Sequence, residues 1–329
     1  MTEPPRRIGL VLGAGGVTGG AFHAGMLSAL QVATGWDPRK AAIVVGTSAG
    51  SVAAASLRAG LSATDLLARA EDHPLSPEGA RLMRDIGPAR RPPPLKTATR
   101  VARPADIAAV LTQFATRPFA APPWALLSSL IPDGQMSTAM ISDTVAGLFP
   151  RDWPAGALWL CAVRQADGRR FVFGKHEPRP PLPDAAAASC AIPGVFRPVT
   201  IGGDAFVDGG AHSPTNADVL VGEELDLVIV SSPMSMTGQR LARSTRSVVR
   251  QWSRALVDAE SLRLRRRGVA VVAFHPTAED IEVMGPNAMD ATRRGRVARQ
   301  IHESTLRRLA RADTRKSLVA LEGLAGGSW

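Results

Sequence analysis

The pentapeptide Gly46-Thr47-Ser48-Ala49-Gly50 is the part of this sequence whose residue types and spacing point most directly to chemistry. It fits G-x-S-x-G, a sharp strand-to-helix turn that lifts a serine hydroxyl out of the end of a sheet. The flanking glycines leave room for the crossing backbones, and the amide after the serine can donate to an oxyanion. An aliphatic run precedes the pentapeptide and small residues follow it. We therefore predict a nucleophile at Ser48 rather than a serine that only caps a helix.

A glycine-rich stretch from 13 to 20 follows the aliphatic run Ile8 to Leu12. The dinucleotide fingerprint G-x-G-x-x-G fails here, because Thr18 stands where its last glycine is needed and Ala14 breaks the register shifted by one. Such a loop can instead aim backbone N–H groups at a developing negative charge beside a helix start. We favour this oxyanion-binding use over nucleotide binding.

A third segment, Asp208-Gly209-Gly210, follows a short strand candidate at 205–207. Upstream of it lies Ala188-Ser189-Cys190-Ala191-Ile192-Pro193-Gly194-Val195-Phe196-Arg197-Pro198-Val199. With these segments the chain resembles the patatin-like phospholipase family. That family carries a glycine-rich oxyanion loop, a G-x-S-x-G elbow, an A-S-x-x-x-P-x-x-F-x-P stretch and a D-G-G or D-G-A motif. All four occur here in that order between Ile8 and Pro233, roughly two thirds of the chain.

The resemblance implies a patatin-like fold and a Ser–Asp dyad. Ser48 would attack the ester carbonyl and form an acyl-enzyme, while Asp208 would accept its proton and later activate water. A carboxylate that acts without an imidazole needs a pKa raised by desolvation. The alternative for Asp208 is a turn residue before two glycines. We assign the oxyanion hole to the amides of Gly15, Gly16 and Val17, and expect no metal and no organic cofactor.

Two positions depart from the glycine loop of the family. Ala14 interrupts a run of four glycines, but it adds only one methyl group, so the backbone donors can survive. Thr18 stands where many members have Arg or Lys. The missing cation would lower the affinity for an anionic headgroup unless an arginine elsewhere takes its role.

Histidines provide the main alternative mechanism. In the Ser…Asp…His order of α/β-hydrolases, Ser48 and Asp208 could be followed by His212 or His275, which would make a Ser-His-Asp esterase for soluble esters. His23 lies on the first predicted helix, and we interpret it as a helix-packing residue. A further alternative retains the fold as a non-catalytic lipid-binding module. We favour an enzyme that cleaves carboxylic esters of (lyso)phospholipids or related lipids.

The elements that must position these residues alternate between strand and helix. An aliphatic run, a small-residue turn and a helical pattern follow one another at 8–32 and again at 42–59. Further strands are predicted at 158–163, 170–174, 205–207, 225–230 and 269–274. Two consecutive strand–turn–helix units predict a three-layer α/β/α domain around a mostly parallel central sheet.

The hydrolase domain is predicted to span residues 8–233, with a proline-rich helical cap inserted at about 60–134. Residues 234–329 are predicted to form a mostly helical, arginine-rich extension packed on the same domain. Its long helix over 239–267 carries nine arginines against two acids. This face is either a solvated surface or a docking site for anionic membranes. Nucleic acid is not expected as a partner, because no recognised reading module or stacking aromatics accompany the charge.

Composition limits the possible classes of protein. The 329 residues are 45% hydrophobic and 21% charged, which is typical of a globular protein and excludes a disordered chain. The net charge of +10 attracts phosphates, including those of lipid headgroups. The two cysteines, Cys161 and Cys190, are too few for a disulfide framework and are predicted to be buried thiols.

The predicted location is cytoplasmic, because no signal-peptide pattern and no membrane-spanning apolar run occurs. We also expect the protein to bind peripherally at the inner face of a membrane. Its lipid substrate would then be presented at a membrane or micelle surface. The sequence leaves the oligomeric state open.

Overall fold

The computed structural model describes residues 7–84, 133–149, 152–177, 179–237 and 245–311. Within these residues an eight-stranded sheet has the order β5-β6-β3-β2-β1-β7-β8, with β4 paired to β3 outside this path. The parallel strands are β3 (Ala157–Arg164), β2 (Ile43–Thr47), β1 (Ile8–Leu12), β7 (Leu227–Ser231) and β8 (Ala270–Phe274). The antiparallel strands are β4 (Arg170–Phe173), β5 (Val199–Ile201) and β6 (Asp204–Asp208). The sheet is therefore mostly parallel, as predicted.

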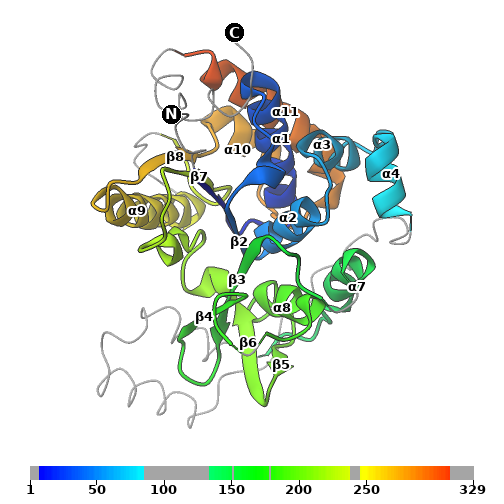
Figure 1. Ribbon diagram of the computed structural model, residues 1–329, viewed down its shortest axis with the longest axis vertical. Helices are drawn as coiled ribbons and strands as arrows, with labels where there is room; N and C mark the ends of the chain where they lie inside the picture. The colour runs from blue at the N-terminus through cyan, green and yellow to red at the C-terminus, as the bar shows by residue number, and fades with distance from the viewer. Residues whose placement is uncertain (1–6, 85–132, 150–151, 178, 238–244, 312–329) are drawn as a thin grey trace, which may run out of the picture.

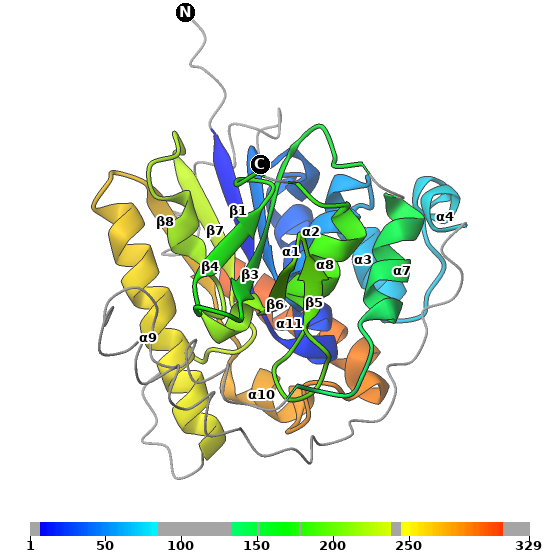
Figure 2. The same cartoon turned by 90° about the horizontal axis from the view of Figure 1, so that it is seen from below.

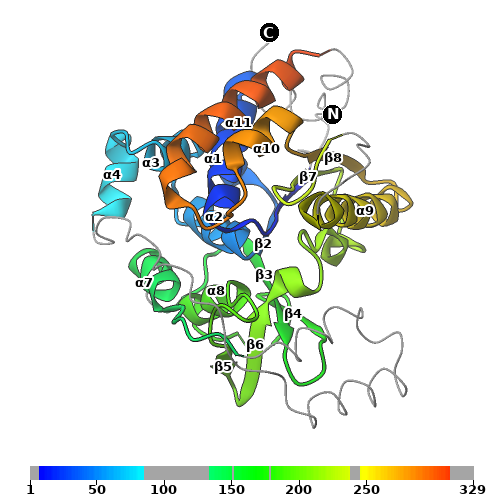
Figure 3. The same cartoon turned by 180° about the vertical axis from the view of Figure 1, so that it is seen from behind.

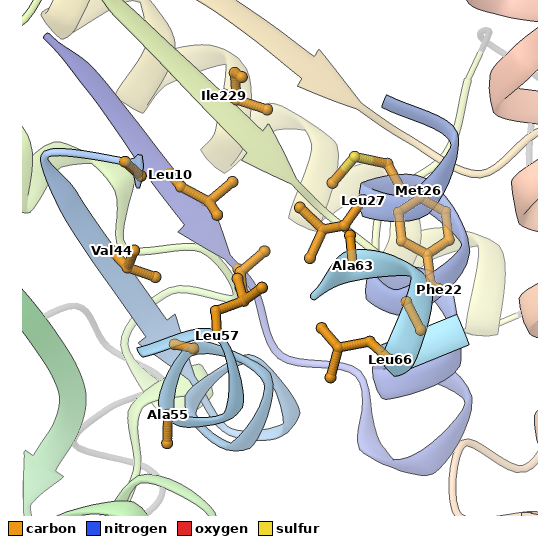
Figure 4. Packing of buried hydrophobic residues seen from close by; sticks show 14 of the residues in the cluster. Leu10, Phe22, Met26, Leu27, Val44, Ala55, Leu57, Ala63, Leu66 and Ile229 are labelled. Atoms are coloured by element: carbon orange, nitrogen blue, oxygen red, sulfur yellow. The ribbon is translucent and has the colours of Figure 1, made fainter. Parts of the chain in front are cut away.

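The central strands are buried on both faces of the sheet. Their side chains point alternately to the two faces and so belong to two hydrophobic cores, one on each face. Leu10 of β1, Val44 of β2 and Ile229 of β7 belong to the larger core, whereas Val11 and Val230 belong to the smaller one. Figure 4 shows the side chains of the first three among those of the helices that cover this face. Burial of each such side chain stabilises the fold by about 1.5–3 kcal/mol.

The larger core lies under a layer of helices on one face of the sheet (Figure 1). These helices are α1 (Gly16–Thr34), α2 (Ala49–Arg58), α3 (Ala63–Ala70), α8 (Leu182–Ser189) and α11 (Arg294–Leu309). Helices α1 and α11 pack closely because Gly25 has no side chain: a Cβ atom there would lie 2.3 Å from the carbonyl oxygen of Ala298. Three shorter helices lie around this layer: α4 (Pro77–Met83), α7 (Ala139–Leu148) and α10 (Ala278–Met284).

Helix α9 (Thr245–Arg265) covers the opposite face of the sheet together with the short 3-10 helix η3 (Ala217–Leu220). Val257 and Leu264 of α9 are fully buried in the smaller core beside Val228 and Val230 of β7. Figures 2 and 3 show α9 well separated from α1 and α11. The architecture is the three-layer α/β/α arrangement predicted from the two strand–turn–helix units.

Two predicted regions are described only in part. Of the predicted cap at about 60–134, residues 85–132 lie outside the described residues, and α3 and α4 form its described beginning. The predicted helix at 239–267 corresponds to α9, and residues 238–244 lie outside the description. The sequence did not predict β5, which has three residues and is a strand because it pairs with β6.

Several arginines of the basic helices hold the fold together. Arg250 donates to the carbonyl oxygens of residues 233 (2.9 Å) and 235 (2.8 Å). Arg265 and Arg308 donate to the carbonyl oxygens of Val271 and Ala273 on the outer edge of β8, each at 3.0 Å. Arg265 and Arg308 thereby bind carbonyl groups that the edge strand β8 would otherwise leave unpaired. None of the described helices is long and apolar enough to cross a membrane.

Candidate active site

Ser48 lies at a strained turn between β2 and α2. Its backbone has φ 56° and ψ −123°, a conformation that costs free energy in a non-glycine residue and is concentrated at functional sites. The flanking glycines are required by close packing, since a Cβ atom would lie 2.6 Å from the Cα of Ser51 at Gly46 and 1.9 Å from the carbonyl oxygen of Leu12 at Gly50. Ala49 begins α2. The pentapeptide thus forms the predicted elbow.

The strand register brings Asp208 to Ser48. Strands β2 and β3 are parallel with Thr47 beside Cys161, and β6 is antiparallel to β3 with Asp208 beside Ala162. The strands that precede Ser48 and end in Asp208 therefore flank β3 and finish at the same level. The hydroxyl of Ser48 is close enough to the carboxyl group of Asp208 to lower the pKa of that carboxyl.

Asp208 is held by its own motif. The N–H of Gly210 donates to Oδ1 of Asp208 at 2.7 Å. Gly209 has to be glycine, because a Cβ atom there would lie 2.3 Å from the carbonyl oxygen of Cys161. The Asp208 side chain is buried, and burial raises its pKa from 3.8 to about 6, while the hydrogen bonds from Ser48 and Gly210 oppose this rise. The carboxylate is thus available as a base at neutral pH.

The glycine loop carries three backbone amides without an acceptor. The N–H groups on either side are used: Ala14 donates to Pro214 and Thr18 to Ala288. None of the described residues accepts a hydrogen bond from the N–H groups of Gly15, Gly16 or Val17. These are the amides assigned to the oxyanion hole, and they lie at the start of α1, where the helix dipole favours negative charge.

His23 fixes the position of this loop. Its Nε2 lies 2.8 Å from the carbonyl oxygen of Gly13, and its Nδ1 lies 2.7 Å from Oγ of Ser231 on β7. A carbonyl only accepts, so Nε2 carries the proton and Nδ1 accepts from the serine hydroxyl. Burial lowers the pKa of His23 to about 4, so the ring is neutral at physiological pH. The predicted packing role is thus accompanied by a specific hydrogen-bonding role.

Ser189, the last residue of α8, forms hydrogen bonds with the elbow and with the first turn of α2. Its hydroxyl donates to the carbonyl oxygen of Cys161 at 2.6 Å. Its Oγ accepts from the N–H of Ser48 at 3.1 Å and from the hydroxyl of Ser51 at 2.6 Å. All four groups are buried. The A-S-x-x-x-P stretch therefore contributes a positioning residue, although its sequence signal gave no role for the serine.

Replacing Ser189 by alanine is expected to lower kcat about tenfold and the free energy of unfolding by about 1–3 kcal/mol, because two buried donors lose their acceptor. Ester turnover and urea unfolding measure the two effects. Ser142→Ala is the matched control, since that hydroxyl donates only to Ala139 within α7. Unchanged turnover together with unchanged stability in Ser189→Ala would contradict a positioning role.

The loop after the Asp208 motif contacts all three functional segments. The carbonyl oxygen of Pro214 accepts from the N–H of Ala14 at 2.7 Å. The side-chain amide of Asn216 donates to Oγ1 of Thr47 at 3.1 Å and to the carbonyl oxygen of Gly209 at 3.3 Å. This loop thereby ties the glycine loop, the elbow and the Asp208 motif into one buried unit.

Glu260 on α9 holds that loop in place. Its carboxylate accepts from the hydroxyls of Ser213 (2.5 Å) and Thr215 (2.6 Å) and from the N–H of Ala217 (2.9 Å). Burial raises the pKa of Glu260, and these hydrogen bonds counteract the effect. From the sequence Glu260 was only one of two acids in a basic helix, and no signal in the sequence indicated its function.

A cavity of about 800 Å³ opens at Ser48. Gly16, Val17 and Ala49 line it with the serine, whereas Gly15 lies outside its lining and packs against Pro233. Most of the remaining wall is apolar, with contributions from α1, α2, α3, α7 and the segment around 192–196. Cavities of this size accommodate a small organic molecule or an acyl chain.

Burial shifts the pKa of each of the other histidines and cysteines considered from the sequence away from neutral pH. His275 lines a separate cavity, hydrogen-bonds Ser235 at 2.6 Å, and has its pKa lowered to about 3 by burial. Burial lowers the pKa of His212 to about 4. Both cysteines are buried, and burial raises the thiol pKa of Cys161 to about 12 and that of Cys190 well above its usual value. Among the described residues, no group of three or more His, Cys, Asp or Glu side chains could hold a metal ion.

Comparison with known proteins links this geometry to one family. The model of the family described as patatin-like phospholipase matches residues 10–221, which include the glycine loop, the elbow and the Asp208 motif. No curated protein is significantly similar to the chain in sequence.

Solved structures also match. VipD from Legionella pneumophila is 14% identical with a TM-score of 0.42, and the match covers 92% of this chain and 66% of that chain. The type III effector protein ExoU is 15% identical with a TM-score of 0.39, and the match covers 96% and 54%. The heterodimeric ExoU–SpcU complex from Pseudomonas aeruginosa is 19% identical with a TM-score of 0.30, and the match covers 98% of this chain and 59% of that chain. This chain thus spans between about half and two thirds of the length of these proteins.

Proposed function

This chain belongs to the patatin-like phospholipase family, and from that premise we propose that it hydrolyses carboxylic esters of (lyso)phospholipids or related lipids through an acyl-Ser48 intermediate. One observation supports the proposal above all: the strand register brings the hydroxyl of a strained serine beside the carboxyl group of a buried aspartate, whose pKa that hydroxyl lowers. The cavity at Ser48 supplies the space for an acyl chain.

In the acylation step Oγ of Ser48 attacks the ester carbonyl while its proton passes to Asp208. The carbonyl oxygen becomes an oxyanion, which the amides of Gly16 and Val17 bind. When the tetrahedral intermediate collapses, the bond to the alcohol oxygen breaks and Asp208 returns the proton to that oxygen. The products are an alcohol and the acyl-enzyme.

In the deacylation step Asp208 removes a proton from water, and the hydroxide oxygen attacks the acyl carbonyl. As the second tetrahedral intermediate collapses, the bond between the acyl carbon and Oγ of Ser48 breaks and Asp208 returns the proton to Oγ, which gives a fatty acid and the free enzyme. A pKa of about 6 suits both transfers, because the group is ionised at neutral pH and still binds a proton transiently.

A dyad accounts for the site better than a Ser-His-Asp triad. Burial lowers the pKa of His212 to about 4 and that of His275 to about 3, so each ring is a weak base, and His275 lines a separate cavity. The titratable group that interacts with the Ser48 hydroxyl is the Asp208 carboxyl group.

We extend the proposal to substrate presented at a membrane or micelle surface. Val248 and Val249 of α9 are 58% and 45% exposed, and Arg266 and Arg267 are exposed at the C-terminal end of that helix. Such a surface could adhere to anionic lipid. Arg250, Arg265 and Arg308 are engaged in the fold, so docking would rely on other arginines. The cytoplasmic location stays a prediction.

The proposal is tested by incubating the protein with phospholipid vesicles, measuring fatty acid release by mass spectrometry, and mapping a fluorophosphonate adduct. Release together with an adduct on Ser48 is expected, and His212→Ala and His275→Ala should remain active. Loss of activity in either histidine variant, with the fold intact, would instead favour the triad. A folded protein that is never labelled at Ser48 would favour a non-catalytic lipid-binding module.

A further inference from the structure

The cavity at Ser48 has one cationic wall. Arg69 of α3 and Arg294 and Arg296 of α11 all line it. Asp72 is the carboxylate among the lining residues, and it forms an ion pair with Arg294. Three arginines and one aspartate leave two excess positive charges on this wall. An anion inside the cavity would be attracted to it.

Arg69 is the unusual member of this wall. It is half-buried, yet its guanidinium forms no hydrogen bond or ion pair with any of the described residues. Burial and the positive charge of Arg294 both lower the pKa of Arg69. A desolvated cation without a partner destabilises a fold. A bound anion would supply the missing interaction.

Arg294 and Arg296 differ from Arg69 in their surroundings. Arg294 donates to the carbonyl oxygen of Ala70 at 3.1 Å as well as pairing with Asp72, so its position is fixed. Arg296 is exposed, and the described residues offer it no carboxylate or carbonyl partner. The wall therefore combines one anchored guanidinium with two that can reorient toward a ligand.

The rest of the cavity suits a lipid with an anionic head. Its other walls carry apolar side chains such as Leu66, Ile141 and Phe196. The glycine loop provides no cation, because Thr18 stands at the position where many members of the family have an arginine or lysine. Thr18 is buried, and its N–H donates to the carbonyl oxygen of Ala288. The only guanidinium groups lining the described part of the cavity come from α3 and α11.

We infer that Arg69, with Arg294 and Arg296, binds the headgroup phosphate of the lipid whose ester Ser48 cleaves. The planar guanidinium of Arg69 can donate two parallel N–H groups to phosphate oxygens. The protein then selects phosphate-bearing lipids over neutral acylglycerols with the same acyl chain. This inference rests on the proposed hydrolase function.

The test compares 1-palmitoyl-lysophosphatidylglycerol with 1-palmitoylglycerol in mixed micelles of one non-ionic detergent, without inorganic phosphate. Palmitate release gives kcat/KM for each, and the anionic-to-neutral ratio is the readout. The wild type should prefer the anionic lipid, and Arg69→Met should reduce the ratio about tenfold. Arg69→Lys, which keeps the charge but loses the fork of donors, should fall between the two. Arg169→Met, an exposed arginine outside the cavity and away from the proposed membrane-docking helix, should leave the ratio unchanged.

Stability separates ligand binding from a structural role. Because Arg69 has no partner among the described residues and its pKa is lowered by burial and by the charge of Arg294, Arg69→Met should melt at the same temperature as the wild type or higher. In the inactive Ser48→Ala background, calorimetry with a decanoyl lysophosphatidylglycerol below its micellar concentration should show Kd raised about tenfold by Arg69→Met.

Each failure has a distinct signature. If the wild type releases no more palmitate than Ser48→Ala from either lipid, the proposed function itself is wrong. If the wild type is active and Arg69→Met leaves both the ratio and Kd unchanged, only the headgroup site is wrong. If inorganic phosphate changes cleavage of the neutral ester in an Arg69-dependent way while the ratio stays near one, the site binds free phosphate and the inference is overturned.

Discussion

Ser48→Ala is expected to lower kcat for ester hydrolysis by about 10⁴-fold or more, because loss of the nucleophile removes the acyl-enzyme route entirely. The remaining rate would come from binding and the oxyanion amides alone. Alanine fits the space of serine at the elbow, and the hydrogen bond from the Ser48 N–H to Ser189 is a backbone interaction that stays. The variant should therefore fold normally.

Time-resolved fatty acid release and intact-mass detection of an acyl adduct measure this effect, with the melting temperature as the check on folding. The wild type should show an adduct of one acyl group during turnover, and the variant should show none. A folded Ser48→Ala protein that keeps a tenth of the wild-type rate would mean that another group attacks the ester.

Asp208→Asn is expected to lower kcat/KM by about 10³-fold or more and to remove its pH dependence near 6. In the wild type the base must be ionised, so kcat/KM should fall about tenfold for each pH unit below about 6 and level off above it. Asparagine accepts no proton, so the variant should show a low rate without that inflection. Rates from pH 4.5 to 8.5 on an uncharged ester measure the profile.

Asp208→Asn should lower activity but raise the free energy of unfolding at neutral and higher pH. Burial raises the pKa of Asp208 from 3.8 to about 6, so its charged form is disfavoured in the folded protein by about 3 kcal/mol. This destabilisation is zero below pH 3.8, grows as the pH rises toward 6, and is complete above it. Asp208→Asn should therefore resist urea better than the wild type at pH 8, and the difference should shrink as the pH falls. A wild-type profile with no inflection between pH 5 and 7 would contradict Asp208 as the base.

Much of the local structure follows from local sequence. The aliphatic runs at Ile8–Leu12 and 42–45 form strands because side chains that are apolar on both faces suit a buried parallel sheet. Gly46 and Gly50 indicated the elbow because only glycine permits such close backbone packing. Each of these signals depends on a few residues that are adjacent in the chain, so it can be recognised from the sequence alone.

The supporting residues could not be predicted in this way. Ser189, Asn216 and Glu260 position the elbow, the Asp208 motif and the glycine loop from elements distant in sequence. A serine, an asparagine or a glutamate in such positions is common in helices and loops. Their roles depend on which backbone groups surround them after folding.

The sequence by itself predicted which residues serve as nucleophile, base and oxyanion amides, because each stands in a short motif whose geometry is set by adjacent residues. Only the tertiary structure decided that β3 separates the strands leading to Ser48 and Asp208 so that their side chains meet. It also decided that Arg69 and Arg294 line one cavity with Ser48. The physical reason is that strand register and helix packing join residues up to 246 positions apart (294 − 48), and no local pattern records that proximity.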